Sequence, residues 1–406
     1  MLVTKKRNWL DTGQQMNLKK KRLAIITSHA IQYNAPLFKA MNEDNNCFTI
    51  KVFYTWSQSN EKVFDKEFGF AFDWDIPLFE GYDYTFVENS SLDPGTHHFR
   101  GIINPTLNDE IEDWKADAML VFRWSFVSHL KAMRHFYNKV PVLFRGDSTL
   151  IDEPSGYSLK KIVRRLFLNW VYSYVDRALY VGNASKKYFL AHGVKMTQLI
   201  FSPHAIDNDR FSSEELNYSE KAQSWRMRLG IRKSDVVFLF AAKLTAKKDP
   251  ELLIKAFLAL SMANTWLVMV GNGELEKQLK DKYYSYPNII FIDFQNQSVM
   301  PVVYRLGDVF ILPSKGPGET WGLAINEAMA CKRAVIASDK CGCSEDLIIN
   351  GKNGYIFQSG NEESLKRSME LAGKNFKDLG NNSGKMINDW SYSKTVEHLN
   401  TFFENK

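Results

Sequence analysis

The sequence predicts an α/β protein made of two doubly wound, Rossmann-like domains that face a central cleft. Three observations predict this fold class. From Leu23 onward, short apolar, β-rich runs alternate with segments of helical period, which is typical of parallel strands joined by crossover helices. A polar stretch over residues 212–234 interrupts the alternation, which then resumes. The chain has 406 residues, enough for two or three domains of ordinary size.

The first series of apolar runs predicts the strands of an N-terminal domain. They are Leu23–Thr27, Thr49–Tyr54, Met119–Phe122, Val140–Phe144 and Ala178–Val181. The second series predicts the strands of a C-terminal domain, which are Val236–Ala241, Trp266–Val270, Ile289–Ile292, Val309–Leu312, Ala334–Ala337 and Tyr355–Phe357. Because open parallel sheets bind ligands beyond the carboxyl ends of their strands, we expect the functional site in the cleft between these two sets of strand ends.

The same patterns suggest the domain boundaries. We predict a flexible basic leader over residues 1–22, the N-terminal domain over 23–205 and the C-terminal domain over 206–385. The last segment, 386–406, has apolar side chains at roughly helical spacing, which predicts a closing C-terminal helix.

Composition and charge exclude several classes of protein. With 45% hydrophobic and 24% charged residues, the chain is neither disordered nor fibrous. The leader contains seven Lys or Arg and one Asp, which accounts for the whole formal charge of +6, so the balanced remainder gives no sign of a nucleic-acid groove. No run of about 18 uncharged apolar residues predicts a membrane span, and four cysteines are too few for a disulfide framework. We expect a cytoplasmic protein that does not bind nucleic acid.

The most informative segment is a strand, a glycine-rich turn and a helix over residues 309–331. Gly322 permits close approach of a ligand just before the helix, where free amides and the helix dipole bind anions, phosphate above all. Glu319 and Glu327 flank this helix start. A carboxylate accepts two hydrogen bonds, so each glutamate can hold a vicinal diol of a sugar or a ribose.

Lysines and glycines follow the first two strands of the C-terminal domain. Lys243 and Lys248 stand beside a predicted helix start, where two ammonium groups would neutralise a diphosphate, while Lys247 is more simply a solvated loop residue. Gly271 and Gly273 form a strand-to-helix turn. It is not the full dinucleotide fingerprint, which disfavours a dehydrogenase but leaves room for a nucleotide lying across this turn.

Polar residues also follow strand ends in the N-terminal domain. His29, Arg123, Arg145 and Asp147 come directly after, or at the end of, three predicted strands. Each could be a structural turn residue, but three strands of one sheet that end in polar groups favour a substrate face.

Three short patterns indicate no metal or redox site. Asp73-Trp74-Asp75 resembles a metal-holding pair of another transferase architecture, but three residues are a weak match. His97 and His98 would point apart in an extended chain, with no third ligand nearby. Cys341 and Cys343 have one residue between them and lack a second pair.

An amphipathic helix is predicted over residues 159–174. Its apolar side chains fall on one stripe, with Lys160, Lys161, Arg164 and Arg165 beside it. The simpler interpretation is a helix that packs on the core with a wet basic face. The alternative is attachment to an anionic membrane surface, which the basic leader would reinforce.

Together these residues resemble a known family. The segment LPSKGPGETWGLAINEAMAC looks like the E-x7-E region of the retaining nucleotide-sugar glycosyltransferases of family 4, which have the GT-B fold. The segments ITSHAIQYNAPLF, FRGDS and PHAIDNDRF also resemble one branch of that family, and the likeness covers most of the chain from about Leu23.

The resemblance implies roles for individual residues in a site that uses no metal. Glu327 would hold the ribose of the donor, Glu319 would contact the transferred sugar, and Lys243 and Lys248 would carry the charge of the leaving diphosphate. The amides of Thr320, Trp321, Gly322 and Leu323 would face the diphosphate, and Gly271 and Gly273 would form the turn beneath the nucleotide. His29 and Asp147 would act from the acceptor side, with Arg123 and Arg145 as further acceptor-side candidates.

The sequence departs from the family pattern at several places, among them Lys332 and Cys341, which each replace a usual glycine. The family usually has Arg at the position of Lys243 and Gly at that of Asp249, and its N-terminal Gly-Gly turn is replaced here by residues 28–32. Because lysine has one ammonium group instead of the forked guanidinium of arginine, we expect Lys243 to make a single contact with the diphosphate.

The resemblance implies transfer of a sugar from a nucleoside diphosphate to an acceptor hydroxyl with retention, in the synthesis of a cell-surface polysaccharide or glycolipid. The expected partners are a nucleotide-sugar donor and a glycan or lipid-linked acceptor, at the inner face of a membrane. Two alternatives stay open: a sugar-nucleotide epimerase or hydrolase on the same fold, and a non-catalytic relative that binds a nucleotide or glycan.

Overall fold

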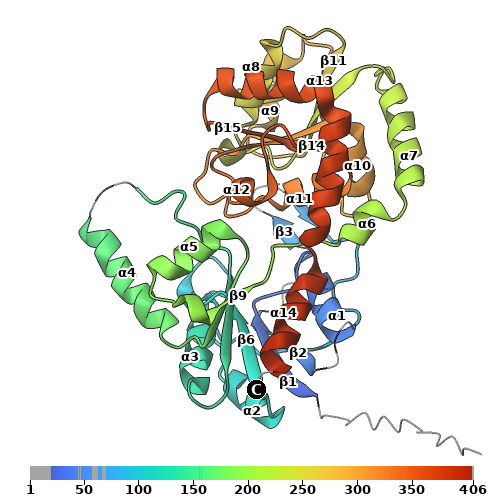
Figure 1. Cartoon of the computed structure of the whole chain (residues 1–406). Helices are drawn as coiled ribbons and strands as arrows, with labels where there is room; N and C mark the ends of the chain where they lie inside the picture. Colours follow the sequence, from blue (N-terminus) through green and yellow to red (C-terminus); the bar gives the residue numbers. More distant parts are fainter. Residues whose placement is uncertain are drawn as a thin grey trace, which may run out of the picture.

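A computed structural model of the chain describes residues 20–43, 45, 47–56, 63–65, 70–154, 156 and 158–404. Figure 1 shows two α/β halves, one above the other, with the end of the chain returning from the upper half to the lower. Apart from its last residues, the predicted leader over 1–22 lies outside the described residues. The first strand begins at Lys21, slightly before the predicted start of the N-terminal domain.

The N-terminal half is built on a seven-stranded parallel sheet with the order β5-β2-β1-β6-β7-β8-β9. Its strands are β1 Lys21–Thr27, β2 Phe48–Tyr54, β5 Asp83–Phe86, β6 Ala118–Phe122, β7 Val142–Gly146, β8 Arg177–Tyr180 and β9 Leu199–Phe201. The five predicted strands are confirmed. The two edge strands β5 and β9 were not predicted. β5 is partly buried and has no continuous apolar run, and β9 is only three residues long.

Helices cover both faces of this sheet, as crossover connections between parallel strands require. They are α1 Ala35–Glu43, α2 Leu107–Asp113, α3 Val127–Phe136, α4 Leu159–Tyr172 and α5 Asn183–Ala191. Short 3-10 turns lie at η2 Phe99–Gly101 and η3 Met196–Gln198, and a small antiparallel pair is formed by β3 Val63–Asp65 and β4 Phe70–Phe72.

The C-terminal half is a six-stranded parallel sheet with the order β12-β11-β10-β13-β14-β15. Its strands are β10 Val236–Ala241, β11 Thr265–Val270, β12 Ile289–Ile292, β13 Val309–Leu312, β14 Ala334–Ser338 and β15 Gly354–Phe357, all six of which were predicted. Its helices are α6 Asn208–Ser212, α7 Glu215–Arg228, α8 Pro250–Leu258, α9 Glu276–Tyr283, α10 Met300–Leu306, α11 Leu323–Ala330, α12 Ser344–Leu347 and α13 Glu362–Met386, with 3-10 turns η4 Ala246–Lys248 and η5 Ile387–Asp389.

Both faces of each sheet are buried, which explains the continuous apolar runs of the strands. In β1, Leu23 and Ile25 belong to a core on one face of the N-terminal sheet, while Ala24 and Ile26 belong to a core on the other face. The strand β10 alternates in the same way, with Leu239 in one core and Phe238 in the other. Polar side chains therefore lie mainly at the strand ends and in the turns that follow them, although Thr49 and Lys51 lie within β2.

The predicted closing helix is α14 Tyr392–Glu404, and it packs on the N-terminal half. Val396, Leu399, Phe402 and Phe403 join the same core as Leu23 of β1, and in Figure 1 the helix lies beside α1. The chain therefore crosses between the halves twice. The two crossings are joined by the side-chain amide of Asn208, which donates to the carbonyl oxygens of Ile387 and Trp390 at 3.3 and 3.1 Å.

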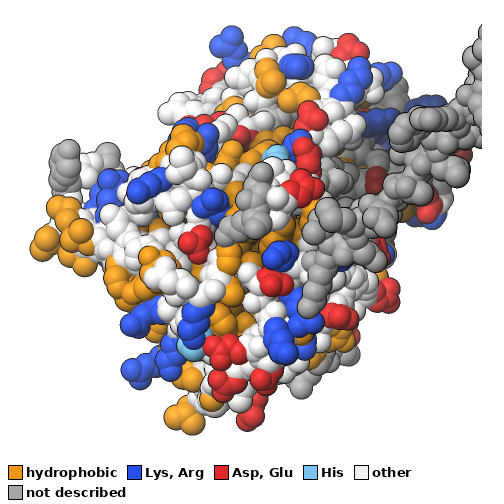
Figure 2. Space-filling view, turned by 60° about the horizontal axis from the view of Figure 1, so that its bottom comes forward, with side chains coloured by type: hydrophobic (Ala, Val, Ile, Leu, Met, Phe, Trp, Pro, Cys, Tyr) orange, Lys and Arg blue, Asp and Glu red, His pale blue; other side chains and the backbone are white. Residues whose placement is uncertain are grey.

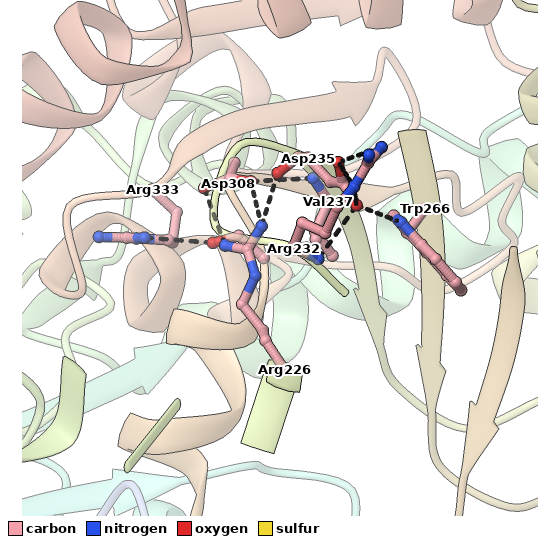
Figure 3. A network of polar contacts seen from close by, with 8 residues as sticks. Arg226, Arg232, Asp235, Val237, Trp266, Asp308 and Arg333 are labelled. Carbon is pink, nitrogen blue, oxygen red and sulfur yellow. Dashed lines mark hydrogen bonds and ion pairs between the residues drawn. The ribbon is translucent and has the colours of Figure 1, made fainter. Parts of the chain in front are cut away.

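A buried ionic network fixes α7 to the amino-terminal edge of the C-terminal sheet (Figure 3). The guanidinium of Arg226 donates to both carboxylate oxygens of Asp308 at 3.2 and 3.3 Å and to the carbonyl of Asp235 at 2.7 Å. Asp308 also accepts from the backbone amide of Val237 at 2.8 Å. This network lies where β10 and β13 begin, at the edge opposite to the one where ligands bind in such sheets.

Candidate functional site

A cavity of about 530 Å³ lies between the carboxyl ends of the two sheets. The N-terminal half and the first crossing contribute Gln32, Tyr33, Trp74, Asp147 and His204 to its wall. The C-terminal half contributes the loops after β10, β11 and β13 and the start of α11. The cavity therefore brings together Asp147, Lys243, Lys248, Gly271, Glu319, Thr320, Trp321, Gly322, Leu323 and Glu327 among the residues predicted for the site.

The start of α11 forms one end of the cavity. Gly322 precedes the helix with a φ of 102°, and a Cβ there would lie 2.8 Å from Cδ2 of Leu312, so only glycine fits without strain. Gly322 also has no side chain that could cap the first amides of the helix. These amides and the helix dipole are available to a phosphate, as the sequence predicts.

Glu319 is a buried carboxylate held by a cation. Nζ of Lys248 donates to it, and Oγ of Ser314 donates to the same oxygen at 2.9 Å. Burial opposes the charge, but Lys248 and the more distant Lys247, together with these hydrogen bonds, hold the pKa of Glu319 below its ordinary value. The residue is therefore an ionised hydrogen-bond acceptor at neutral pH.

Glu327 is buried deeper in the wall and is held by two tyrosines. The hydroxyl of Tyr304 donates to Oε2 at 2.5 Å and that of Tyr33 to Oε1 at 3.3 Å. Burial raises the pKa of Glu327, although these hydroxyls and the charge of Arg210 act in the opposite direction. The two tyrosines were not predicted. No sequence signal marks Tyr304, while Tyr33 lies in a segment that contributed to the family resemblance.

Lysines line the cavity beside the turn that precedes α11. Lys243 and Lys248 do so as predicted, but the interpretation of Lys247 as a solvated loop residue is wrong. Its Nζ donates to the carbonyl of Gly318 at 2.7 Å, since the loop after β10 folds against the glycine turn after β13. Asp249 adopts a left-handed backbone with a φ of 48°, a conformation that glycine adopts more easily.

The turn after β11 is packed against the turn after β10. A Cβ on Gly271, whose φ is 132°, would lie 2.3 Å from the carbonyl oxygen of Ala242, so the close approach requires glycine. Gly271 lines the cavity, and Gly273 supports the turn from behind, against the backbone of Leu244.

Three predicted acceptor-side residues lie outside the cavity lining. Arg145 is buried and donates to Oγ of Ser202 at 3.1 Å and to the carbonyl of Pro203 at 3.3 Å, so its observed contacts hold the first crossing. His29 contacts Oγ of Ser28 at 2.9 Å, and burial and the charge of Arg123 lower its pKa to about 4. The acceptor-side roles of His29 and Arg123 stay predictions.

The segment Asp73-Trp74-Asp75 connects the two halves. The carboxylate of Asp75 accepts from the backbone amide of Ser298 at 3.0 Å and from its hydroxyl, and the side chain of Asn296 donates to the carbonyl of Asp73 at 2.6 Å. Trp74 lines the cavity. The observed contacts give the segment an interdomain role rather than that of a paired-carboxylate metal site.

The prediction that His97 and His98 point apart is wrong. Both Nε2 atoms approach the carboxylate of Asp93, at 3.5 and 3.2 Å, in a segment that folds back so that the amide of Gly95 donates to the carbonyl of Gly101 at 3.0 Å. Across the part of the chain that the structure describes, this exposed trio is the one such group whose ligand atoms lie within 4.8 Å of one another. None of the three lines the cavity.

Cys341 and Cys343 are buried free thiols, and burial raises the pKa of each. They are therefore poor nucleophiles.

Comparison with known proteins relates the C-terminal half to a known family. Residues 221–385, which supply the loops after β10, β11 and β13 and the start of α11, match the family described as glycosyl transferases group 1. This part of the chain is therefore similar to the group 1 glycosyltransferases. The whole chain has the expected two-domain GT-B architecture. It matches the structure of Anabaena HepE in complex with UDP and glucose over 95% of this chain and 100% of that chain, with a TM-score of 0.68 and 14% identity.

Other relatives agree with this assignment. A glycosyltransferase of Rickettsia africae matches over 95% of this chain and 98% of its own, with a TM-score of 0.70 and 14% identity. In sequence, an uncharacterized glycosyltransferase of Methanocaldococcus jannaschii is 26% identical over 45% of this chain. The alpha-monoglucosyldiacylglycerol synthase of Acholeplasma laidlawii is 29% identical over 38% of it. These two matches span 43% and 39% of the relatives' own lengths.

Proposed function

We propose that this glycosyltransferase moves a sugar from a nucleoside diphosphate sugar to an acceptor hydroxyl. The observation that carries the proposal is the arrangement around α11. Glu319 precedes the helix start and Glu327 lies inside the helix, while Lys243 and Lys248 face the same cavity from the loop after β10. The two carboxylates can accept hydrogen bonds from sugar hydroxyls, and the helix start between them can bind an anion. This order matches a pyrophosphate flanked by two sugars.

The donor would lie along the cavity with its ribose at Glu327. Tyr33 and Tyr304 fix the orientation of this carboxylate, so that its remaining lone pairs can accept from vicinal hydroxyls. The diphosphate would then lie at the start of α11, and Gly271 would leave room for the nucleotide across the turn after β11. The transferred sugar would lie nearest to Glu319.

The reaction requires stabilisation of the charge that develops on the departing diphosphate. Lys243, Lys247 and Lys248 would supply three ammonium groups to the cavity, and the amides at the start of α11 would supply dipoles. Such preorganised groups stabilise a developing charge more strongly than water does. Lys248 would redirect part of its hydrogen bonding from Glu319 to the phosphate.

We propose that the acceptor attacks from the face that the diphosphate leaves, which retains the configuration of the sugar carbon. Glu319 is hydrogen-bonded by Lys248 and Ser314, which suits a carboxylate that binds sugar hydroxyls rather than one that attacks carbon. The departing phosphate would accept the proton of the acceptor hydroxyl. Asp147, His29 and Arg123 are proposed to act on the acceptor side, where Asp147 lines the cavity.

UDP-sugars are the proposed donor class, because the matched HepE structures contain UDP and UDP-glucose. The proposed acceptor is a glycan or a lipid-linked sugar of the cell surface. Relatives named for such products support it, including the lipopolysaccharide 1,2-N-acetylglucosaminetransferase of Salmonella typhimurium, which is 31% identical over 32% of this chain. We propose that the enzyme works in the cytoplasm, at the inner face of a membrane. No helix among the described residues is long and apolar enough to cross one.

A panel of UDP-, GDP- and ADP-sugars tests this proposal. We expect at least one sugar nucleotide to raise the melting temperature, because a ligand that binds only the folded state stabilises it. Product analysis with and without candidate acceptors then separates transfer from hydrolysis or epimerisation of the donor. Release of free sugar at the same rate with and without every acceptor would contradict the proposal, as would donor binding that never leads to turnover.

A further inference from the structure

Helix α4 exposes a continuous apolar stripe. Its members are Leu159, Ile162, Val163, Leu166, Phe167 and Trp170, which we call the α4 stripe. Their spacing places all six on one face of the helix. Leu159 is 77% exposed, Leu166 is 65% exposed, and none of the six is buried. Single exposed apolar side chains are ordinary, but six on one face mark an interaction surface.

The helix is held to the protein by its opposite face. Leu168, Val171 and Tyr172 are buried in the core beneath the N-terminal sheet. Lys161 and Arg165 turn toward the protein and both pair with Glu153, at 3.1 and 3.2 Å. The prediction that the apolar stripe packs on the core is therefore wrong. The core uses a second, shorter apolar face, and the stripe is left outside.

Cations border the stripe. Residues 159–172 contain four basic side chains and no acidic one. Lys160 and Arg164 are exposed, and neither makes an ion pair with any described residue. The guanidinium of Arg134, from α3, lies 5.6 Å from the ring centroid of Trp170 and adds a third cation at the end of the stripe. An apolar face bordered by positive charge is complementary to an anionic lipid surface.

The position of α4 relates this surface to the cavity. In Figure 1 the helix projects from the side of the N-terminal half, and Figure 2 shows hydrophobic side chains gathered at the same projection with basic ones beside them. The loop before α4 contacts the turn that precedes α11, residues 316–322, which we call the donor turn. Asp147 accepts from Oγ1 of Thr320 at 2.7 Å, and Asp152 accepts from the backbone amide of Gly318 at 2.8 Å. A surface that binds α4 would therefore lie near the site of transfer.

We propose that α4 docks in the plane of an anionic lipid bilayer, with the α4 stripe at the level of the acyl chains and Lys160 and Arg164 at the phosphates. The lipid surface is favoured over a protein partner because the stripe is convex, combines aliphatic with aromatic side chains and has cations along its border. The inference rests on the proposed function, since a lipid-linked acceptor would lie in this surface. It adds the element that places the enzyme there.

Vesicle flotation without donor or acceptor tests the proposal. The full chain is mixed with vesicles of phosphatidylglycerol and phosphatidylcholine, or of phosphatidylcholine alone. We expect clear preference for the anionic vesicles. The double variant Val163→Glu/Leu166→Glu should lower the bound fraction at least tenfold, whereas Leu216→Glu, at an 82% exposed position on α7, should leave it unchanged.

The charge contribution has its own matched pair of variants. Lys160→Glu/Arg164→Glu should weaken binding to anionic vesicles about tenfold and make it less sensitive to salt. Lys374→Glu/Lys377→Glu makes the same charge change on exposed positions of α13 and should have little effect. Equal binding of wild type and both α4 variants would overturn the proposal, as would no binding of wild type to anionic vesicles.

Sedimentation velocity on the same preparations detects the other occupant of the stripe. A wild-type dimer that the Val163→Glu/Leu166→Glu variant converts to monomer, without any vesicle binding, would assign the stripe to a second copy of the chain and overturn the proposal. Thermal shift with UDP-sugars keeps the two proposals separate. Loss of vesicle binding with donor stabilisation intact concerns α4 alone, while absence of donor stabilisation with vesicle binding intact concerns the proposed function.

Discussion

Oγ1 of Thr320 donates a hydrogen bond of 2.7 Å to the carboxylate of Asp147, and this contact joins the donor turn to the N-terminal sheet. Thr320 stands just before α11, and Asp147 follows β7. The two halves therefore contact one another beside the cavity. Closure of the halves over a bound sugar nucleotide would exclude water that would otherwise hydrolyse it.

Removing this hydrogen bond should impair turnover. Thr320→Val replaces the donating hydroxyl by a methyl group, and we expect kcat/KM to fall about tenfold, which corresponds to about 1.4 kcal/mol. Thr320→Ser keeps the hydroxyl and should retain most of the activity. The measurement is steady-state kinetics with donor and acceptor varied separately. Equal activity of the valine and serine variants would show that the contact has no part in catalysis.

Glu319→Gln should abolish transfer while nucleoside diphosphate binding persists. The amide cannot carry the charge that Lys248 now stabilises, and it offers a single acceptor oxygen to sugar hydroxyls. We expect turnover to fall at least a hundredfold and the affinity for UDP, measured by calorimetry, to change less than about fivefold. Glu363→Gln, on the exposed face of α13, is the control. Loss of UDP binding in proportion to turnover would contradict the division of roles.

Lys243→Ala tests the stabilisation of the leaving group. Loss of one ammonium group from the cavity should lower both turnover and nucleotide affinity. If both stay within about twofold, or about 0.4 kcal/mol, the assignment is wrong. Lys277→Ala removes an exposed lysine of α9 and should change neither quantity.

The half-buried imidazole of His29 predicts a pH dependence of stability. Its ordinary pKa of 6.5 is lowered to about 4, by burial first and by Arg123 second. Between these values the unfolded chain binds a proton that the folded chain does not, so the free energy of unfolding falls as the pH falls. The contribution is no more than about 3 kcal/mol.

Chemical denaturation of wild type and His29→Gln at several pH values between 7 and about 4 measures this contribution. The variant should lose less stability on acidification than wild type. Parallel pH profiles of the two proteins would show that His29 does not titrate in this way. Other enclosed histidines such as His129 are present in both proteins, so the difference between the profiles isolates His29.

Asp308→Ala should destabilise the fold without altering the site. The change leaves the buried guanidinium of Arg226 without its carboxylate, and the amide of Val237 without its acceptor (Figure 3). Breaking a buried pair in this way costs about 3–5 kcal/mol. We expect a lower midpoint of urea unfolding and unchanged kcat for the folded fraction. A selective loss of kcat at full stability would contradict a purely structural network.

The sequence was most informative where the apolar pattern of a segment follows directly from its place in the fold. Buried parallel strands must be apolar on both faces, so the strands of both sheets and the cleft at their ends could be predicted. Glu319 and Lys243 could be placed at the cavity for the same reason, because each closely follows a strand, and Glu327 could be placed there because it lies about one turn inside the next helix.

Contacts between distant segments could not be predicted in this way. Tyr33 reaches Glu327 across the boundary between the halves, and Lys247 contacts the glycine turn after β13. Neither residue type nor spacing encodes such a meeting. For α4, the amphipathic pattern gave the apolar stripe but not what covers it, since packing on the core and exposure to a partner produce the same periodicity.

The double crossing between the halves has a consequence for how the enzyme opens. Residues near Ile206 and near Asp389 pass side by side, tied by Asn208, so the halves are connected by two parallel straps instead of one. Two connections would restrict twisting and sliding of one half against the other. The motion that they would leave is a rocking of the halves about the line that joins the two connections. Product release and donor entry would then follow a single degree of freedom, and a cut in the second strap would free the lobes to swivel while also stripping α14 from the core that it completes.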